Sequence, residues 1–178
     1  MLRDAVPATS RSMRDWIGFD LMRQLSKRTQ YSLRALYALT RKYGAGPVLI
    51  TNLSKDEVIP KKFLEQILVS LKGAGFVSSK KGKGGGYLLA MPPEEITIGS
   101  VIRAVEGPLA PLPCASETRF RKCDECVDIE TCGTRIVMRR VRDAMSEILD
   151  ETTLAAVCRE VDLAKNAPKR PGSTEFVI

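Results

Sequence analysis

The sequence of 178 residues contains no histidine. Histidine is the usual general base, the usual partner in catalytic dyads and the commonest nitrogen ligand for a metal. Without it, any metal must be held by sulfur or oxygen. The sequence also lacks a G-x-G-x-x-G motif after a predicted strand, which would indicate a nicotinamide or flavin site. We therefore expect that the chain is not an enzyme.

The sequence has no apolar run long enough to cross a bilayer, and its first residues lack the apolar stretch of a signal peptide. We therefore expect a cytoplasmic protein with no membrane partner. It contains five cysteines. In a cytoplasmic protein these indicate metal binding or redox sensing rather than a framework of disulfides.

Positive charge is concentrated in one part of the chain. Residues 22–92 carry a net charge of +10, whereas residues 1–21 are neutral and residues 93–178 carry −3. A basic first module joined to a mildly acidic second one suggests a part that binds a polyanion and a part that does something else. A solvated basic face is the plainer alternative.

The pattern of apolar and turn residues predicts a mainly helical fold with a small β-hairpin. Thr51 or Asn52 is expected to cap the second helix, and Pro60 suits the first position of the third. The long last helix carries an apolar stripe, which is a candidate dimerisation face or packs on its own domain; the stripe comprises Val137, Val141, Ala144, Met145 and Ile148. The predicted helices cover residues 25–43, 50–58, 60–74, 98–106 and 133–151, and the strands cover 76–79 and 87–90.

Three helices followed by a hairpin is the order of a winged helix-turn-helix, in which the third helix enters the DNA major groove. Its first turns carry Lys61, Lys62, Glu65 and Gln66. Lysine can meet guanine or phosphate, glutamine can pair with adenine, and glutamate can accept from cytosine. The hairpin tip, or wing, holds lysines among glycines that let the backbone approach a minor groove or phosphates closely; they are Lys80, Lys81 and Lys83.

Four cysteines lie within 19 residues, in the pattern C114-x8-C123-x2-C126-x5-C132. Thiolates hold iron–sulfur clusters, usually four per cluster, and they also hold structural zinc. These cysteines stand beside prolines and acids without an apolar pattern, which disfavours core packing. Cys158 follows the apolar run LAAV, so we expect it to be a buried structural thiol.

Several stretches resemble the IscR, NsrR and BadM type (Rrf type) of winged-helix regulators, over roughly residues 25–157. The matching stretches are LSKRTQYSLRAL, IPKKFLEQIL, GKGGGYLL, ITIGSVIRAVEGP and TTLAAV. The resemblance implies a dimeric transcription factor. It places the base-reading carboxylate and amide of the recognition helix on Glu65 and Gln66, and the minor-groove residue of the wing near Lys81.

The same resemblance bears on the cysteines. Cluster-binding members typically use three cysteines before the dimerisation helix, which would be Cys114, Cys126 and Cys132. In one branch a histidine three residues past the last cysteine is the fourth ligand. That position is Arg135 here, which stays protonated and cannot ligate. Cys123 could complete an all-thiolate shell. An aspartate or glutamate from the first helix of the partner subunit could compete with it as fourth ligand, and so could the nearby acids Asp124, Glu125 and Asp128.

We therefore expect a homodimeric transcription regulator, a repressor of genes near a palindromic operator in double-stranded DNA. It would sense iron–sulfur status, or redox or nitrosative stress, through a [2Fe–2S] or [4Fe–4S] cluster held by Cys114, Cys123, Cys126 and Cys132. A thiol–disulfide switch and a structural zinc ion are alternatives, as is a small cysteine-based redox protein that does not bind DNA. The residues expected to contact DNA are Lys27, Thr29, Tyr31, Lys61, Lys62, Glu65, Gln66, Lys80, Lys81, Lys83, Gly85 and Tyr87.

The chain is expected to divide into six parts. The first is a flexible arm, or a start placed too early, at 1–24. A winged-helix module at 25–92 and a short helix with a proline-rich connector at 93–113 follow. The cysteine loop at 114–132 leads into a dimerisation helix region at 133–158. A disordered tail is expected at 159–178.

Overall fold

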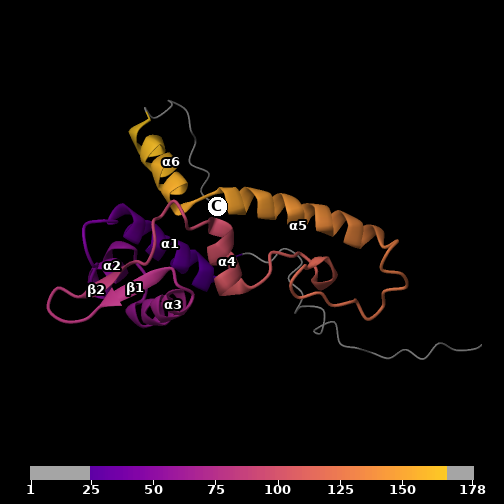
Figure 1. The fold of residues 1–178 in the computed structure, drawn as a ribbon, viewed down its shortest axis with the longest axis horizontal. Coiled ribbons are helices and arrows are strands. Elements are labelled where there is room, and N and C mark those ends of the chain that lie inside the picture. Colours follow the sequence, from indigo (N-terminus) through magenta and orange to yellow (C-terminus); the bar gives the residue numbers. More distant parts are fainter. Residues whose placement is uncertain (1–24, 168–178) are drawn as a thin grey trace, which may run out of the picture.

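The computed structural model of the chain describes residues 25–167. The expectations for residues 1–24 and for 168–178 lie outside the described residues. The described part holds six α-helices, one 3-10 helix and one hairpin (Figure 1). Their bounds are α1 (Lys27–Arg41), α2 (Ile50–Asp56), α3 (Lys61–Gly73), β1 (Val77–Lys80), β2 (Gly86–Leu89), α4 (Ile98–Glu106), η2 (Pro113–Ala115), α5 (Gly133–Glu151) and α6 (Leu154–Asn166).

Helix α1 is the centre of the first module. Ser26 caps its start by accepting a hydrogen bond from the Thr29 backbone N–H at 3.2 Å. This satisfies one of the N–H groups that a helix leaves unpaired at its first turn. The helix contacts α3, β2, α4 and α6, so segments from both ends of the described chain meet on it.

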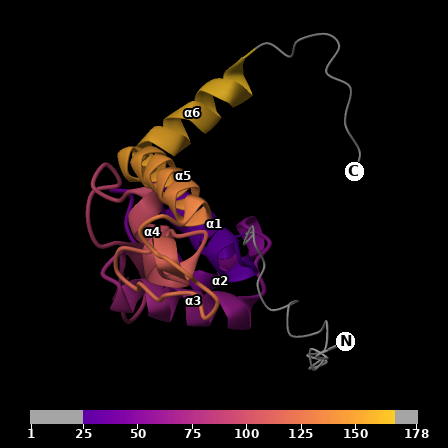
Figure 2. The same cartoon turned by 90° about the vertical axis from the view of Figure 1, so that its right-hand side faces the viewer.

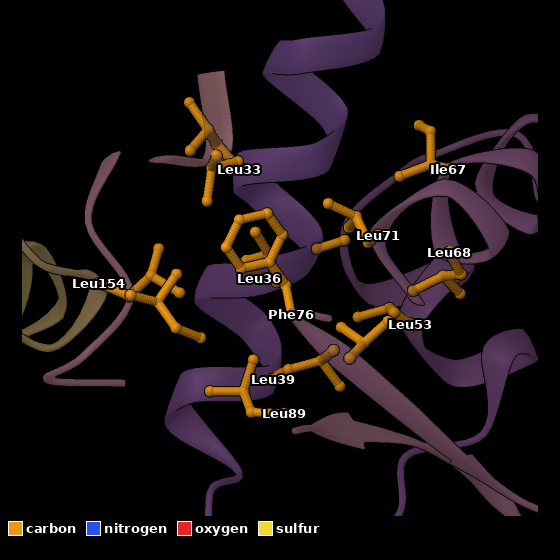
Figure 3. Close-up of a cluster of buried hydrophobic side chains, with 14 of the residues drawn as sticks. Leu33, Leu36, Leu39, Leu53, Ile67, Leu68, Leu71, Phe76, Leu89 and Leu154 are labelled. Carbon is orange, nitrogen blue, oxygen red and sulfur yellow. The ribbon is translucent and has the colours of Figure 1, made fainter. Parts of the chain in front are cut away.

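The core forms where α1, α2, α3 and the hairpin meet. Leucines at helical spacing on α1 face apolar side chains of α3, and Phe76 and Leu53 close the space between them (Figure 3). Leu154 of α6 reaches the same core and is fully buried. Replacing one such buried leucine by alanine typically costs about 2–5 kcal/mol of stability, so this core fixes the orientation of α3.

The wing is tied to the helices as well as to itself. β1 and β2 pair antiparallel, in a register that runs from Val77 opposite Leu89 to Lys80 opposite Gly86. Val48, in the loop before α2, exchanges two backbone hydrogen bonds with Tyr87, at 2.8 and 2.9 Å. A side chain at Gly86 would collide with the carbonyl of Val48, so glycine permits this close approach.

The second half of the described chain reaches away from this module. Figure 1 shows α5 as a long arm, with residues 114–132, referred to below as the cysteine segment, beneath it. Figure 2 shows α6 leaving α5 at a steep angle. The Ile98 N–H donates to the Thr152 carbonyl at 2.8 Å, and the Leu154 N–H donates to the Ile96 carbonyl at 2.9 Å. The turn between α5 and α6 is therefore fixed to the start of α4. Within residues 25–167, no helix is long and apolar enough to cross a membrane.

The expected disordered tail from residue 159 is wrong as far as Asn166, because α6 continues to that residue. The expected helical region 133–158 consists of two helices, α5 and the first part of α6. Thr153 caps the second by accepting from the Ala156 N–H at 3.1 Å, and buried Leu154 anchors it. The sequence beyond Cys158 is polar and therefore gave no signal for this helix, whose buried residues are Leu154, Ala155 and Cys158.

Two local expectations are also wrong. Leu49 is the N-cap of α2 and no side chain bonds there, so neither Thr51 nor Asn52 caps this helix. Pro60 stands at the N-cap of α3 rather than at its first helical position. The predicted bounds of α4 and α5 agree with the structure, and the other predicted bounds of α1 to β2 lie within two residues.

The turn between α2 and α3 contains a strained residue. Val58 has φ 51°, and the residue is 77% exposed. The left-handed conformation costs an L-residue about 1–2 kcal/mol, and an exposed side chain recovers little of this by packing. We predict that Val58→Gly raises the free energy of unfolding by about 1 kcal/mol, measured by urea denaturation.

The matched control is Val69→Gly, at an exposed position inside α3. There glycine weakens a helix, so the free energy of unfolding should fall by about 0.5 kcal/mol. Equal signs for the two variants would contradict the strain at Val58.

Candidate DNA-binding surface and cysteine segment

Helix α3 has the two faces that a recognition helix needs. Its apolar residues, such as Leu64 and Leu68, are buried against the core. The polar side chains of its first turns are exposed together, and they are Lys61, Lys62, Glu65 and Gln66. The core thus fixes the helix while leaving groups that can donate to and accept from base edges at its N-terminal end.

The wing presents its lysines in the same way. Lys80, Lys81 and Lys83 are exposed around the hairpin tip. Gly85 is different, because it is buried and a side chain there would collide with the Lys80 carbonyl. Its N–H donates to the Gly82 carbonyl at 2.9 Å. Gly85 therefore closes the turn, and its contact with DNA stays a prediction.

The residues predicted on α1 divide between surface and interior. Lys27 is exposed. Thr29 has 0% exposure, and its hydroxyl donates to Oε1 of Glu106 at 2.6 Å. The Thr29 hydroxyl is therefore engaged inside the protein in this structure, and its contact with DNA stays a prediction. Sequence reasoning missed Glu106, which also accepts from the Ser26 N–H at 2.8 Å, because no local pattern pairs residues about eighty positions apart.

The two tyrosines predicted to contact DNA are half-buried. The Tyr31 ring packs edge-on against Phe63 of α3 with centroids 5.7 Å apart, and the Arg34 guanidinium lies 5.8 Å from its centre. Tyr87 belongs to the strand that joins Val48. Both tyrosines pack against the core and are only partly exposed to a ligand.

The four clustered cysteines differ in exposure. Cys114 is buried in η2, Cys126 and Cys132 are half-buried, and Cys123 is exposed. The Cys126 N–H donates to the Cys123 carbonyl at 3.2 Å, which closes a turn around the C-x2-C pair. Burial raises the pKa of the Cys114 thiol, and a hydrogen bond with Cys123 and the nearby Cys132 raise it further.

These contacts place Cys114 beside Cys123. The described part of the chain nevertheless contains no group of three or more cysteine, aspartate or glutamate side chains close enough to hold a metal ion. The predicted four-cysteine shell thus remains a prediction. Cys158, expected to be a buried thiol, is buried on α6, and burial raises its pKa.

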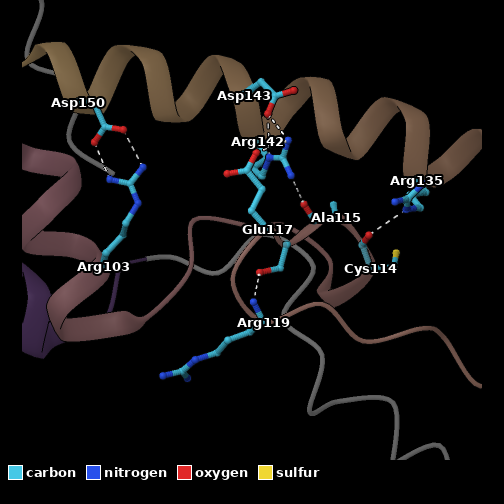
Figure 4. Close-up of polar contacts among 10 residues, drawn as sticks. Arg103, Cys114, Ala115, Glu117, Arg119, Arg135, Arg142, Asp143 and Asp150 are labelled. Atoms are coloured by element: carbon cyan, nitrogen blue, oxygen red, sulfur yellow. Dashed lines mark hydrogen bonds and ion pairs between the residues drawn. The ribbon is translucent and has the colours of Figure 1, made fainter.

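Two arginines of α5 hold the segment that carries Cys114 (Figure 4). Arg135 Nε donates to the Cys114 carbonyl at 3.0 Å, and Arg142 Nη1 donates to the Ala115 carbonyl at 2.6 Å. Arg142 is only 7% exposed and pairs with Glu117 at 3.1 Å and with Asp143. Arg135 therefore contacts the cysteine segment through the backbone carbonyl of Cys114. Sequence reasoning gave Arg142 no role.

Helix α5 has a second, unpacked face. Residues 135 and 142 are two turns apart and lie on the side that holds η2. On the opposite side, Val137, Val141 and Ile148 of the apolar stripe are 50%, 40% and 66% exposed. Within the described residues these three side chains and Ala144 are thus left exposed, whereas Met145 is half-buried.

The C-terminal part of α5 is joined to α4. The Arg103 guanidinium donates to both carboxylate oxygens of Asp150, at 2.5 and 2.7 Å. This pairing lowers the pKa of Asp150. A side chain at Gly99 would collide with that carboxylate, so the glycine lets α4 and α5 approach. A continuous set of contacts therefore runs from η2 through α5 and α4 to Glu106 and the start of α1.

A comparison with sequence families matches residues 25–160 to Rrf2, described as an iron-dependent transcriptional regulator. The chain belongs to the Rrf2 family. It is 35% identical over 133 residues to an rrf2-like HTH-type transcriptional regulator of Rhodobacter capsulatus, covering 73% of this chain and 89% of that relative. The relatives are named as transcriptional regulators, which agrees with the expectation that the chain is not an enzyme.

Solved structures of Rrf2 regulators share the fold. CymR (YrzC), the global cysteine regulator of B. subtilis, superposes with a TM-score of 0.66 at 31% identity, over 78% of this chain and 98% of CymR. T. potens IscR gives a TM-score of 0.65 at 30% identity, over 83% of this chain and 95% of that one. The predicted family and the predicted winged-helix fold are confirmed.

Proposed function

We propose that this Rrf2 regulator is a repressor that binds a palindromic DNA operator as a homodimer and senses its signal through the cysteine segment. The observation that carries the DNA-binding part is that the polar start of α3 and the lysines of the wing are both exposed, in a module of net charge +10. Lysines attract the phosphates, and Glu65 and Gln66 can read base edges. We place this action in the cytoplasm, where thiols stay reduced.

The dimer would form through the exposed stripe of α5. In aqueous solution, a contiguous apolar surface on a helix often marks a site of contact with another apolar surface. A twofold interface uses the same patch on both copies. Pairing along α5 would set the distance between the two α3 helices. A palindromic operator follows, because half-sites must match that distance.

For the sensing part, we propose that Cys114, Cys123, Cys126 and Cys132 hold one iron–sulfur cluster. The family description as iron-dependent supports it, and so does the all-sulfur donor set. After η2, residues 116–132 hold no helix or strand, so their thiols can approach one another without breaking an element. When bound, such a cluster supplies a centre sensitive to iron supply and oxidants.

A thiol–disulfide switch without a cluster is the second candidate. The specific observation in its favour is that Cys123 lies close enough to the buried Cys114 to raise the pKa of its thiol. The solved structure of CymR, named the global cysteine regulator, is also a relative in this family. Structural zinc is the third candidate, because four thiolates suit it equally well.

The DNA-binding proposal is tested by selecting duplexes from a random pool with the purified protein. Glu65→Ala should broaden the recovered sequences, because losing one good base contact costs about 1–3 kcal/mol of discrimination. Lys81→Ala should weaken binding to all duplexes together. It should also reduce the slope of log affinity against log salt by about one for each Lys81 removed.

Lys165→Ala, which removes an exposed lysine from α6 outside the basic module, is the matched control and should bind as the unaltered protein does. Recovery of no preferred duplex would contradict DNA recognition. A change of sequence preference in Lys81→Ala, with none in Glu65→Ala, would mean that another element reads the bases.

The cluster proposal is tested by anaerobic purification with absorbance, iron and labile sulfide analysis. Cys→Ser at 114, 123, 126 or 132 should lower cluster occupancy or stability and change DNA affinity, because each removes a ligand. Cys158→Ser is the matched control and should leave both unchanged. An unchanged spectrum and DNA response in Cys123→Ser would place the fourth ligand elsewhere.

Two other outcomes identify the alternatives. A colourless protein loaded with zinc supports the structural zinc ion. A protein without metal whose DNA affinity responds reversibly to oxidant and reductant supports the thiol switch.

A further inference from the structure

The contact between η2 and α5 depends on two guanidinium groups that bind consecutive carbonyls. Arg135 binds the carbonyl of Cys114, and Arg142 binds that of Ala115. Because these arginines lie two turns apart on one helix face, the two bonds together fix η2 in position and orientation along α5. We refer to these two bonds as the η2 clamp.

Opening the η2 clamp would remove only some of the partners of Arg142. Arg142 is buried, and its charge is balanced by Glu117 of the cysteine segment and by Asp143 of its own helix. If η2 moved away, Arg142 would lose Ala115 and Glu117 and keep Asp143. In that open arrangement water would replace the lost partners, and the carboxylate of Asp143 would still balance the charge. The loss of two partners would make the open arrangement the less stable of the two in the unmodified protein.

Cys114 connects this clamp to sulfur chemistry. Its thiol is buried beside Cys123 while its carbonyl is held by Arg135. Both groups belong to one residue, so a chemical change that displaces the sulfur strains the bond from Arg135. The closed clamp suits the buried thiol, and an enlarged or displaced Cys114 side chain suits the open clamp.

The other end of the chain of contacts lies at the DNA-binding module. Asp150 of α5 binds Arg103 of α4, and Glu106 of α4 binds the capped start of α1, which packs on α3. The face of α5 opposite the clamp carries the apolar stripe. The position of α5 therefore bears on both α3 and the dimer face.

We propose that Arg135 and Arg142 are positioning residues that couple the state of Cys114 to DNA affinity. The closed clamp favours the arrangement that binds DNA, and opening it lowers DNA affinity. The inference rests on the proposed DNA-binding function and is independent of whether a cluster, a disulfide or another modification opens the clamp. Because coupling between two sites is reciprocal, bound DNA must also hold Cys114 closed.

The test uses reduced, metal-free full-length protein and the duplex recovered by the selection above. Iodoacetamide labelling of each cysteine is measured by mass spectrometry under single-hit conditions, with and without duplex. The duplex should slow labelling of buried Cys114 about fivefold or more, within the usual range of allosteric coupling. It should leave Cys158 unchanged, because that buried thiol lies on α6, away from η2.

The deciding variant is Arg135→Gln. It should lower DNA affinity about as much as alkylation of Cys114 does in the unaltered protein, and alkylation should then have no further effect. The duplex should no longer protect Cys114. Arg139→Gln, which removes an exposed charge from the same helix, should behave as the unaltered protein does. Arg142→Lys keeps the buried charge and should also lose most of the coupling, since a lysine cannot reproduce the guanidinium fork.

The labelling rate of Cys158 reports whether a variant is folded. Only a variant in which Cys158 is labelled as fast as in the unaltered protein is used to test the coupling. If Arg135→Gln and Arg142→Lys retain the protection of Cys114 by DNA, the clamp does not couple the two sites. A merely structural role would also leave the effects of Arg135→Gln and Cys114 alkylation additive, which contradicts the proposal. If the unaltered protein binds no duplex, the DNA-binding function fails; if it binds and Cys114 labelling is unchanged, only the coupling fails.

Discussion

The second half of this structure depends on one buried positive charge. Removing the Arg142 guanidinium from water is expensive unless partners surround it, and it has three in Ala115, Glu117 and Asp143. Two of these belong to the cysteine segment, which contains little regular structure of its own. That segment is thus placed by α5, and through α5 it is joined to the rest of the protein.

The same helix explains why the molecule is extended. One side of α5 is used by polar contacts to η2 and by the Arg103–Asp150 pair, while its apolar stripe faces outward. A helix with an exposed apolar stripe needs a partner, whereas the core around α1 is complete within one chain. The buried core around α1, which α4 and α6 help to build, and the exposed stripe of α5 are therefore two different patterns of burial, and the proposed dimer would cover the second.

Local patterns predicted α4 and α5 well, because each has a strong apolar period and a clear end, at Gly107 for α4. They did not predict α6 beyond Cys158, since its anchor lies in Thr153 and Leu154 and its later turns are polar. They also gave no sign that the Thr29 hydroxyl donates to Glu106, because the two residues are distant in the sequence. The exposed residues of α3 and the wing were found because the resemblance and the charge pattern both pointed to them. The η2 clamp was not, because backbone carbonyls leave no signal in a sequence.

The central claim of this account is that α5 holds the cysteine segment with one face and a second copy of the chain with the other. The mass of the protein in solution, measured by light scattering, tests it most directly. The unaltered protein should have twice the chain mass, and Val141→Asp should have the mass of one chain, because an aspartate would bury a charge in the apolar stripe. Val69→Asp, an identical change at an exposed position of α3, should remain a dimer. A dimer that survives Val141→Asp, or an unaltered protein with the mass of one chain, would contradict the account.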